Sequence, residues 1–447
     1  MTDPTVRPQA TQGTASQPRT PTSSRWRRWV LGYWWCLAVL LPAMARADML
    51  DDLISQVLVS HPATRSQRAL VASATAGVDS ARWQFYPTPS ARLEVANTSP
   101  TDRLYQGDIQ SSTLSLQQPL WTGGRLSSGL NKARAALTVS EAGLEEVRHK
   151  LALQVLQAYG EWMSASLQTL ANEKSLATHV RLREQVERRI AQGASAHTDL
   201  VLAVARLELI FAEVTAARAR AQIALAHLEQ LLGGPVDAPG LFAALAEPRA
   251  LNGTPQVLLD RALTINPSVQ KSRAQAQERE TVIGERRADY SPEIYVRFEE
   301  QFGNHNFPDA GAQSRVFVGL STRFGAGLSA LSNVEEAQAN YQSALAEIEV
   351  QTRAVSDQVL SDQALVVSSA IRYTALKTSL QAAGEVSASY DRQFLAGRKS
   401  WLDVMNAARE LAQTATQLAE VQATQVVATW RLVIYTSGVG AVTGKTL

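Results

Sequence analysis

Apolar residues recur at two different periods along the chain, and the first period is helical. Between residues 126 and 192 they step by three and four positions, which places them on one face of a helix that packs against another helix. These positions are Leu144, Val147, Leu151, Val155, Ala158 and Trp162. No proline, which interrupts helices, occurs between Pro119 and Pro235. The pattern predicts one helix over residues 126–192, roughly 100 Å long at 1.5 Å per residue.

A second region of the same kind spans residues 328–396 and lies beyond Pro308, the last proline of the chain. Gly193 and Gly397 follow the two regions, and helix-forming sequence resumes after each glycine. The resumed stretches span residues 194–232 and 398–435. A glycine between two helical stretches indicates a tight break. Each half of the chain is therefore predicted to form a long helical hairpin.

The second period is an alternation of apolar and polar residues, and it precedes each long helix. The alternating apolar residues are Leu114, Leu116 and Leu120 in the first segment and Val316, Val318 and Leu320 in the second. This alternation predicts strands, which with their partners span residues 90–98, 113–120, 293–302 and 315–324. Polar loops, residues 99–112 and 303–314, join them into two hairpins. A tilted strand of about 9 to 11 residues crosses an outer membrane, so both hairpins are of membrane-spanning length.

The two halves of the chain repeat each other. A shift of 205 positions superposes His61-Pro62 on Asn266-Pro267, and a shift of 204 superposes Gly193 and Asp199 on Gly397 and Asp403. We therefore expect a first repeat over residues 48–232, a Pro/Gly-rich segment over 233–258, a second repeat over 259–435 and a tail over 436–447. The fold class expected is mostly α with membrane β, and each repeat combines a strand hairpin with a long helical hairpin.

The N-terminus has the pattern of a secretory signal peptide. Three arginines precede an uncharged apolar run over residues 29–41, and Ala45-Arg46-Ala47 follows it. The run is too short to span a bilayer, so we expect residues 1–47 to be removed, and a short retained anchor is the alternative. The single cysteine, Cys36, lies inside this leader.

The charge balance and the motifs of the chain do not favour a nucleic-acid-binding protein or an enzyme. Without the six Arg and one Asp of the leader, the 43 basic and 41 acidic residues become 37 and 40, which does not suit a nucleic-acid binder. The six histidines lack ligand spacing, so we expect no metal and no cofactor. The run 437–446 resembles a phosphate-binding loop, but Val439 stands where its first glycine belongs and only Leu447 follows. No catalytic motif supports the remaining alternative of a periplasmic enzyme.

Four strands cannot close a membrane barrel, and an open sheet edge is not tolerated in lipid. Several chains must therefore share one barrel. Bacterial single-chain barrels begin at eight strands, so a dimer is the minimum, and the twelve strands of a trimer would leave an open lumen.

Two motifs make the chain resemble the TolC-like outer membrane factors. Residues 118–125, Gln-Pro-Leu-Trp-Thr-Gly-Gly-Arg, are similar to the segment that opens the first long helix in that family, and residues 396–407 are similar to its periplasmic tip. The resemblance covers the mature chain. It implies a homotrimer without enzymatic activity, in the outer membrane of a Gram-negative bacterium, with a twelve-stranded β-barrel continued by an α-helical periplasmic tunnel. It also implies contact with outer membrane lipid, a periplasmic adaptor and an inner-membrane transporter of the ABC or another export class.

The resemblance also implies roles for residues near the tips. Asp403 matches an acidic pore position, Asn406 stands where the family has a second acid, and Lys399 stands where a basic residue tethers the closed state. Asp199 is the counterpart of Asp403 in the first hairpin. Both aspartates follow a break, so they also suit the capping of the helices that begin there.

The implied adaptor-docking residues are Gly193, Gly397, Arg398 and Trp401. Each has a structural alternative. The glycines supply tight turns, Trp401 suits a core as well as a docking anchor, and Arg398 suits adaptor contact as well as simple solvation.

The function expected is a passive exit duct, gated at the helix tips. The tip sequence 396–404 resembles that of factors that serve large adhesin-like exporters, which implies type I secretion of such a protein, with small-molecule or multidrug efflux as the alternative. A soluble periplasmic coiled-coil scaffold also suits the long helices, but it leaves the alternating strands unexplained.

Overall fold

The computed structural model of the chain describes residues 49–97, 102, 106–251, 253–307, 311–322 and 329–443. All of them belong to one compact unit, residues 48–447. The predicted signal peptide lies outside the described residues, as do the ends of two predicted strands, at 98 and 323–324.

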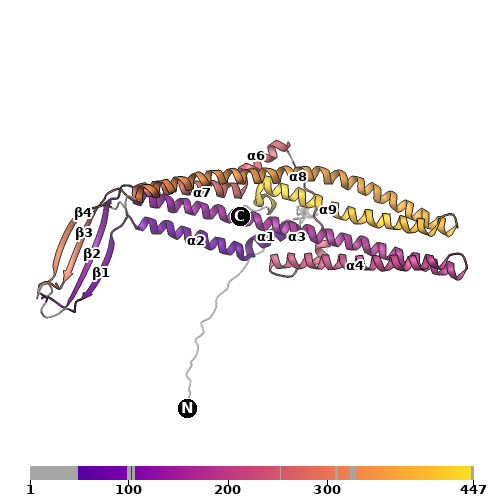
Figure 1. The fold of residues 1–447 in the computed structure, drawn as a ribbon, viewed down its shortest axis with the longest axis horizontal. Helices are drawn as coiled ribbons and strands as arrows, with labels where there is room; N and C mark the ends of the chain where they lie inside the picture. The colour runs from indigo at the N-terminus through magenta and orange to yellow at the C-terminus, as the bar shows by residue number, and fades with distance from the viewer. Residues whose placement is uncertain are drawn as a thin grey trace, which may run out of the picture. The chain divides into compact units, whose positions relative to one another are not determined.

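The elements follow the same order in both halves of the chain (Figure 1). The first half contains α1 (Met49–Ser60), α2 (Pro62–Trp83), β1 (Thr88–Val95), β2 (Gln110–Trp121), α3 (Arg125–Ala191) and α4 (His197–Leu232). After α5 (Ala238–Ala243), the second half contains α6 (Pro255–Ile265), α7 (Pro267–Ala288), β3 (Glu293–Phe302), β4 (Gln313–Ser321), α8 (Ser329–Leu395) and α9 (Trp401–Thr443). α3 and α8 both have 67 residues, and α2 and α7 both have 22.

The His-Pro and Asn-Pro pairs that aligned in the sequence begin equivalent helices. Nδ1 of His61 accepts a hydrogen bond from the backbone N–H of Ala63 at 3.1 Å, and Oδ1 of Asn266 accepts one from Ser268 at 2.9 Å. Each cap has extended backbone angles and precedes a proline at the first helical position, where a missing N–H costs nothing. Two different side chains therefore cap equivalent helices in the same way.

Several boundaries differ from those expected. β2 begins at Gln110 and β4 at Gln313, so strand extends into both predicted loops. The segment 233–258 contains α5 and the start of α6. The tail is helical as far as Thr443, because α9 continues through a kink at Gly438, where φ is 76°. Val442, beyond this kink, is buried in the main core, and its apolar packing explains why the tail is ordered.

The long helices pack side by side around α3, which contacts α2, α4, α7 and α9, while α8 contacts α7 and α9. Tyr159 and Trp430 lie fully buried in the largest core. Their polar atoms hold the segment after α5: the Tyr159 hydroxyl accepts from the N–H of Ala246 at 2.7 Å, and Nε1 of Trp430 donates to the carbonyl of Glu247 at 2.9 Å. The Arg249 guanidinium stacks on Trp430 at 4.1 Å. The connection between the halves is thereby fixed to the helical core.

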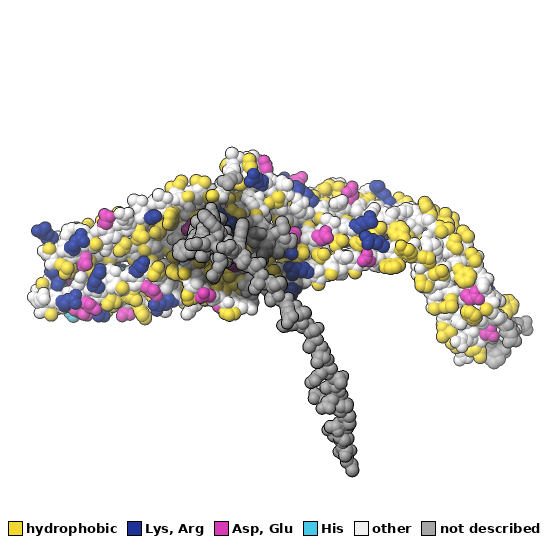
Figure 2. All heavy atoms as spheres, turned by 180° about the vertical axis from the view of Figure 1, so that it is seen from behind, with side chains coloured by type: hydrophobic (Ala, Val, Ile, Leu, Met, Phe, Trp, Pro, Cys, Tyr) yellow, Lys and Arg dark blue, Asp and Glu magenta, His cyan; other side chains and the backbone are white. Residues whose placement is uncertain are grey.

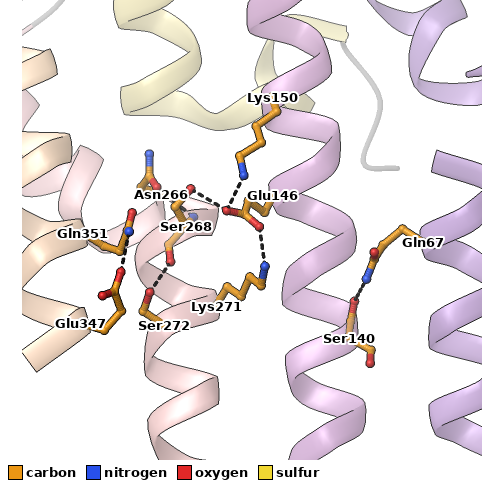
Figure 3. Close-up of polar contacts among 10 residues, drawn as sticks. All are labelled: Gln67, Ser140, Glu146, Lys150, Asn266, Ser268, Lys271, Ser272, Glu347 and Gln351. Atoms are coloured by element: carbon orange, nitrogen blue, oxygen red, sulfur yellow. Dashed lines mark hydrogen bonds and ion pairs between the residues drawn. The ribbon is translucent and has the colours of Figure 1, made fainter. Parts of the chain in front are cut away.

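A polar contact joins α3 to α7 nearer the strands (Figure 3). The Glu146 carboxylate lies between Nζ of Lys150, at 2.9 Å, and Nζ of Lys271, at 2.8 Å, and accepts a hydrogen bond from Ser268. Burial raises the pKa of Glu146, but the two lysines outweigh it, so the pKa is lowered overall. Glu146 is therefore a charged bridge between the two halves of the chain.

We expect Gly160→Ala to destabilise the protein, because the added Cβ would lie 2.2 Å from Cγ2 of Val427 on α9. Valine is stiff at χ1, so the helices must separate, and overpacking of this kind costs about 1–3 kcal/mol. Gly129→Ala on the same helix is the control: nothing lies within 4 Å of its new Cβ, so better helix propensity should raise stability slightly. Thermal unfolding measured by circular dichroism compares the two, and equal melting temperatures would contradict the close crossing.

Candidate functional site

The four strands form one antiparallel sheet in the order β1-β2-β3-β4, with one apolar face. Leu116, Phe298 and Val316 lie side by side on three adjacent strands, and all three are exposed. Exposed apolar residues of this face include Leu93, Val95, Leu114, Leu116, Ile294, Phe298, Phe302, Val316, Val318 and Leu320. Figure 2 shows hydrophobic side chains gathered over the strand-bearing end. In water such a surface is unfavourable, whereas lipid suits it.

The opposite face of the sheet is polar. Ser115, Glu299 and Arg315 occupy one row across adjacent strands, and the hydroxyl of Ser90 contacts that of Ser115 at 2.7 Å. Nε of Arg297 lies 3.1 Å from Oε1 of Glu299 within this face. Because strand residues alternate between faces, the sheet separates an apolar surface from a charged, hydrogen-bonded one. A water-filled lumen suits the polar face.

Exposed aromatic side chains gather where helices meet strands. They are Trp83 at the end of α2, Phe85 and Tyr86 after it, Trp121 at the end of β2, and Tyr290 before β3. The rings of Trp83 and Tyr86 contact each other, with centroids 5.2 Å apart. Aromatic residues in such a band favour the boundary between lipid and water. The band marks the junction as the interface level.

At the far end of the long helices, two glycines form matching turns. Gly193 and Gly397 have φ angles of 72° and 73°, in the left-handed region. In each turn the glycine N–H donates to a carbonyl three residues back and the following N–H donates five residues back, the Schellman pattern that ends helices. Nothing lies within 4 Å of a Cβ added at either glycine. Both tips are therefore tight turns with open space in front of them.

Asp403 and Ser400 form a reciprocal cap at the start of α9. Oδ2 of Asp403 accepts from the Ser400 N–H at 3.1 Å and from its hydroxyl at 2.8 Å, while the Asp403 N–H donates to Oγ of Ser400 at 3.2 Å. The hydrogen bond from the Ser400 side chain is the main cause that lowers the pKa of Asp403, and Lys399 adds to it. Asp403 is thus a charged capping residue in the protomer.

The other residues expected at the gate are placed differently. Asn406 is exposed on α9, and Nζ of Lys399 lies 4.3 Å from the centre of the Tyr390 ring. Asp199 lies in the first turn of α4, whose cap residue, Ala196, offers no side-chain hydrogen bond. Asp199 therefore does not reproduce the cap that Asp403 makes.

Trp401 is 4% exposed and belongs to the core of the tip. Its ring lies 5.4 Å from that of Phe394, and Leu182, Val186 and Val404 complete its surroundings. Of the two roles open from the sequence, this burial fits the core role and leaves little of the ring for a partner. Arg398, in contrast, is exposed.

Arg189 connects the two hairpins, and sequence analysis missed it. Its guanidinium donates to the carbonyls of Ala194 at 3.3 Å and Phe394 at 3.1 Å and to Oγ of Ser195 at 3.2 Å, and it stacks on the Phe394 ring at 4.5 Å. A basic residue in the last turn of a helix was its only sequence signal, and that signal is common. Arg189 holds the first turn against the end of α8.

None of the described helices combines the length and hydrophobicity needed to cross a bilayer. Within the same ranges, no group of three or more His, Cys, Asp or Glu side chains is placed to hold a metal ion.

Comparison with known sequences agrees with these features. Residues 53–234 match the family described as outer membrane efflux protein. The cobalt-zinc-cadmium resistance protein CzcC of Cupriavidus metallidurans is 27% identical over 73% of this chain and 75% of its own length. The alkaline protease secretion protein AprF of Pseudomonas aeruginosa is 26% identical over 75% of this chain and 70% of its own.

Solved structures share the fold. The channel CusC superposes with a TM-score of 0.74 at 19% identity, over 87% of this chain and 91% of that chain. The open MtrE outer membrane channel of Neisseria gonorrhoeae gives 0.73 at 18% identity, over 90% and 91%. The family match and the shared fold confirm the resemblance and set aside the soluble scaffold. Residues 53–234 thus match the outer membrane efflux protein family, and the described part of the chain has the fold of solved channels such as CusC and MtrE.

Proposed function

We propose that the chain is the exit duct of a tripartite export system, in which three copies close one twelve-stranded barrel that an α-helical tunnel continues. The observation that carries this proposal is the two-faced sheet, whose edge strands β1 and β4 lack a partner within the described chain. Unpaired backbone groups are not tolerated in lipid. Twelve strands from three copies close the barrel and leave an open lumen.

Within this duct the chain consists of two repeats, residues 48–232 and 259–435. The equal lengths of α3 and α8, 67 residues each, support this division. Equal lengths also bring the two turns, at Gly193 and Gly397, to the same level of the tunnel.

The partners in this proposal are a periplasmic adaptor at the tips, an inner-membrane ABC or other export transporter, and outer membrane lipid. The exposed tip residues Gly193, Gly397 and Arg398 support the adaptor's place, since open space surrounds both turns. Trp401, buried behind them, supports the tip from inside.

Transport through the duct is passive and gated at the tips. The proposed gate consists of Asp403, Asn406, Lys399 and Asp199. The depressed pKa of Asp403 keeps its carboxylate charged, and the contacts of Arg189 hold the two hairpins of a protomer together. Opening of the gate requires these contacts to shift as a group.

The cargo in this proposal is a secreted protein, most simply a large adhesin-like protein of a type I system. The similarity to AprF, which is named for protease secretion, and the tip sequence 396–404 support it. The second candidate is small-molecule or metal efflux, which the similarity to the resistance protein CzcC favours.

The mature chain, purified in detergent, should have the mass of a trimer and form discrete pores in a planar bilayer. The reason is the unpaired edges of the sheet, which require other copies. Light scattering with detergent correction and single-channel recording measure both properties. A monodisperse monomer without conductance would contradict the shared barrel.

Asp403→Asn and Ser400→Ala separate the gate role from the cap role. Asparagine keeps a capping oxygen but removes the charge, whereas Ser400→Ala removes the cap and keeps the charge. If Asp403 lines the pore, Asp403→Asn lowers cation selectivity and Ser400→Ala does not. Reversal potentials in a salt gradient measure this, and unchanged selectivity in Asp403→Asn would leave capping as its role.

Deletion of the gene should abolish export of one surface protein and leave tolerance to metals and drugs unchanged. Surface proteomics and growth inhibition assays measure the two outcomes, with the gene restored on a plasmid as the control. Lost tolerance with an intact surface proteome would favour the efflux candidate and overturn the secretion proposal.

A further inference from the structure

α8 carries an exposed apolar stripe that none of the roles above uses. Leu360, Val367 and Ile371 are 51%, 62% and 66% exposed, and Ala364 lies exposed between them. Their spacing of three and four residues is that of a helix face that packs against another helix. Single exposed apolar residues are ordinary, whereas a continuous stripe marks an interaction surface.

The stripe belongs to one of the two outermost helices of the protomer. Towards the tips the helices contact each other in the order α4, α3, α9, α8, so α4 and α8 are the borders (Figure 1). The strands repeat this order: β4, which precedes α8, is one edge of the sheet, and β1, from the same half of the chain as α4, is the other. In the proposed duct β4 of one copy meets β1 of the next. α8 then comes beside α4 of the next copy.

The internal repeat shows what covers the equivalent stripe on α3. A shift of 204 residues superposes α3 on α8 at both ends. The α3 residues that match the stripe are Leu156, Gly160, Met163 and Leu167. Leu156 and Met163 are buried in the main core, to which α9 contributes. A Cβ added at Gly160 would lie 2.2 Å from Cγ2 of Val427 on α9. The face that α9 covers in the first half of the chain is therefore exposed in the second half.

The surface of α9 that covers α3 also has an exposed counterpart. The same shift superposes Ala423 and Val427 of α9 on Ala219 and Ile223 of α4. Ala423 is buried in the main core and Val427 packs against it. Ala219 and Ile223 are exposed, Ile223 at 59%. Each copy therefore presents, on opposite borders, both surfaces of a contact that its own α3 and α9 already make.

We propose that the stripe on α8 of one copy packs against α4 of the next copy, with Ala364 opposite Ile223, and so closes the tunnel wall between copies. This inference rests on the proposed duct, which supplies the neighbouring copy. The contact is head-to-tail, and such contacts between identical copies form a ring when the rotation closes. Ala364 carries the Cβ that Gly160 lacks, so the copies approach each other less closely than α3 and α9 do.

Disulfide cross-linking of the full mature chain in detergent tests this contact, because the only cysteine, Cys36, lies in the predicted leader. Within the chain, a Cβ at Gly160 would lie 3.6 Å from Cβ of Val427, and a disulfide needs about 3.5–4.5 Å. Ala364→Cys with Ile223→Cys should therefore convert most of the protein into covalent trimers on gels without reductant. Neither variant alone should cross-link, and the two single variants expressed together should give covalent dimers.

The matched control is Ala364→Cys with Ala212→Cys, which moves one cysteine along the same side of α4. Positions 212 and 223 are 11 residues apart. At 1.5 Å per residue this is about 16 Å, which a disulfide does not span. All three positions are exposed in the protomer, so the substitutions leave its core intact. The control should stay uncross-linked. Equal cross-linking in the control, or a link within one chain, overturns the proposed contact.

Light scattering of the same samples before denaturation distinguishes this inference from the proposed duct. A particle with the mass of a trimer that gives no covalent link overturns the contact between α8 and α4 and leaves the duct standing. A monomer in the wild type and in both variants overturns the duct, and the contact with it.

Discussion

The outer edges of β1 and β4, which have no strand partner within the described residues, are the constraint on which the rest of the molecule depends. A sheet with one apolar face belongs in lipid, but lipid offers no hydrogen bonds to its edges. In the proposed duct these edges meet strands of other copies, and the closed barrel then fixes where the helices begin. The aromatic band at Trp83, Tyr86 and Tyr290 sets the depth at which this happens.

The long helices α3 and α8 connect the sheet to the turns at Gly193 and Gly397. α3 packs against α1, α2, α4, α7 and α9, and Glu146 joins it to α7 while Gly160 allows the close approach of α9. The segment after α5 is fixed to the same core through Tyr159 and Trp430. A helical wall held at so many points transmits displacement along its length instead of bending locally.

Hydrophobic periodicity and the positions of proline and glycine were enough to predict the long helices and the strands, because these are local properties of the sequence. Helices over 126–192 and 328–396 agree with α3 and α8 to within one residue at each end. The ordered tail could not be predicted in this way, since Val442 is held by contacts distant in sequence. The role of Arg189 could not be predicted for the same reason, since its partner Phe394 lies 205 positions away.

Asp403 shows how one carboxylate serves two purposes. Both hydrogen bonds from Ser400 end on Oδ2, so the cap leaves Oδ1 available to water or to a cation in the proposed gate. Because those bonds depress the pKa, the cap stabilises α9 above the ordinary aspartate pKa near 4, and that stability is lost as the pH falls through the lower folded value. The conditions that keep the helix start intact are therefore also those that keep the gate charged. Asn406, one turn further on, adds no charge, so the negative potential of each tip of α9 rests on Asp403.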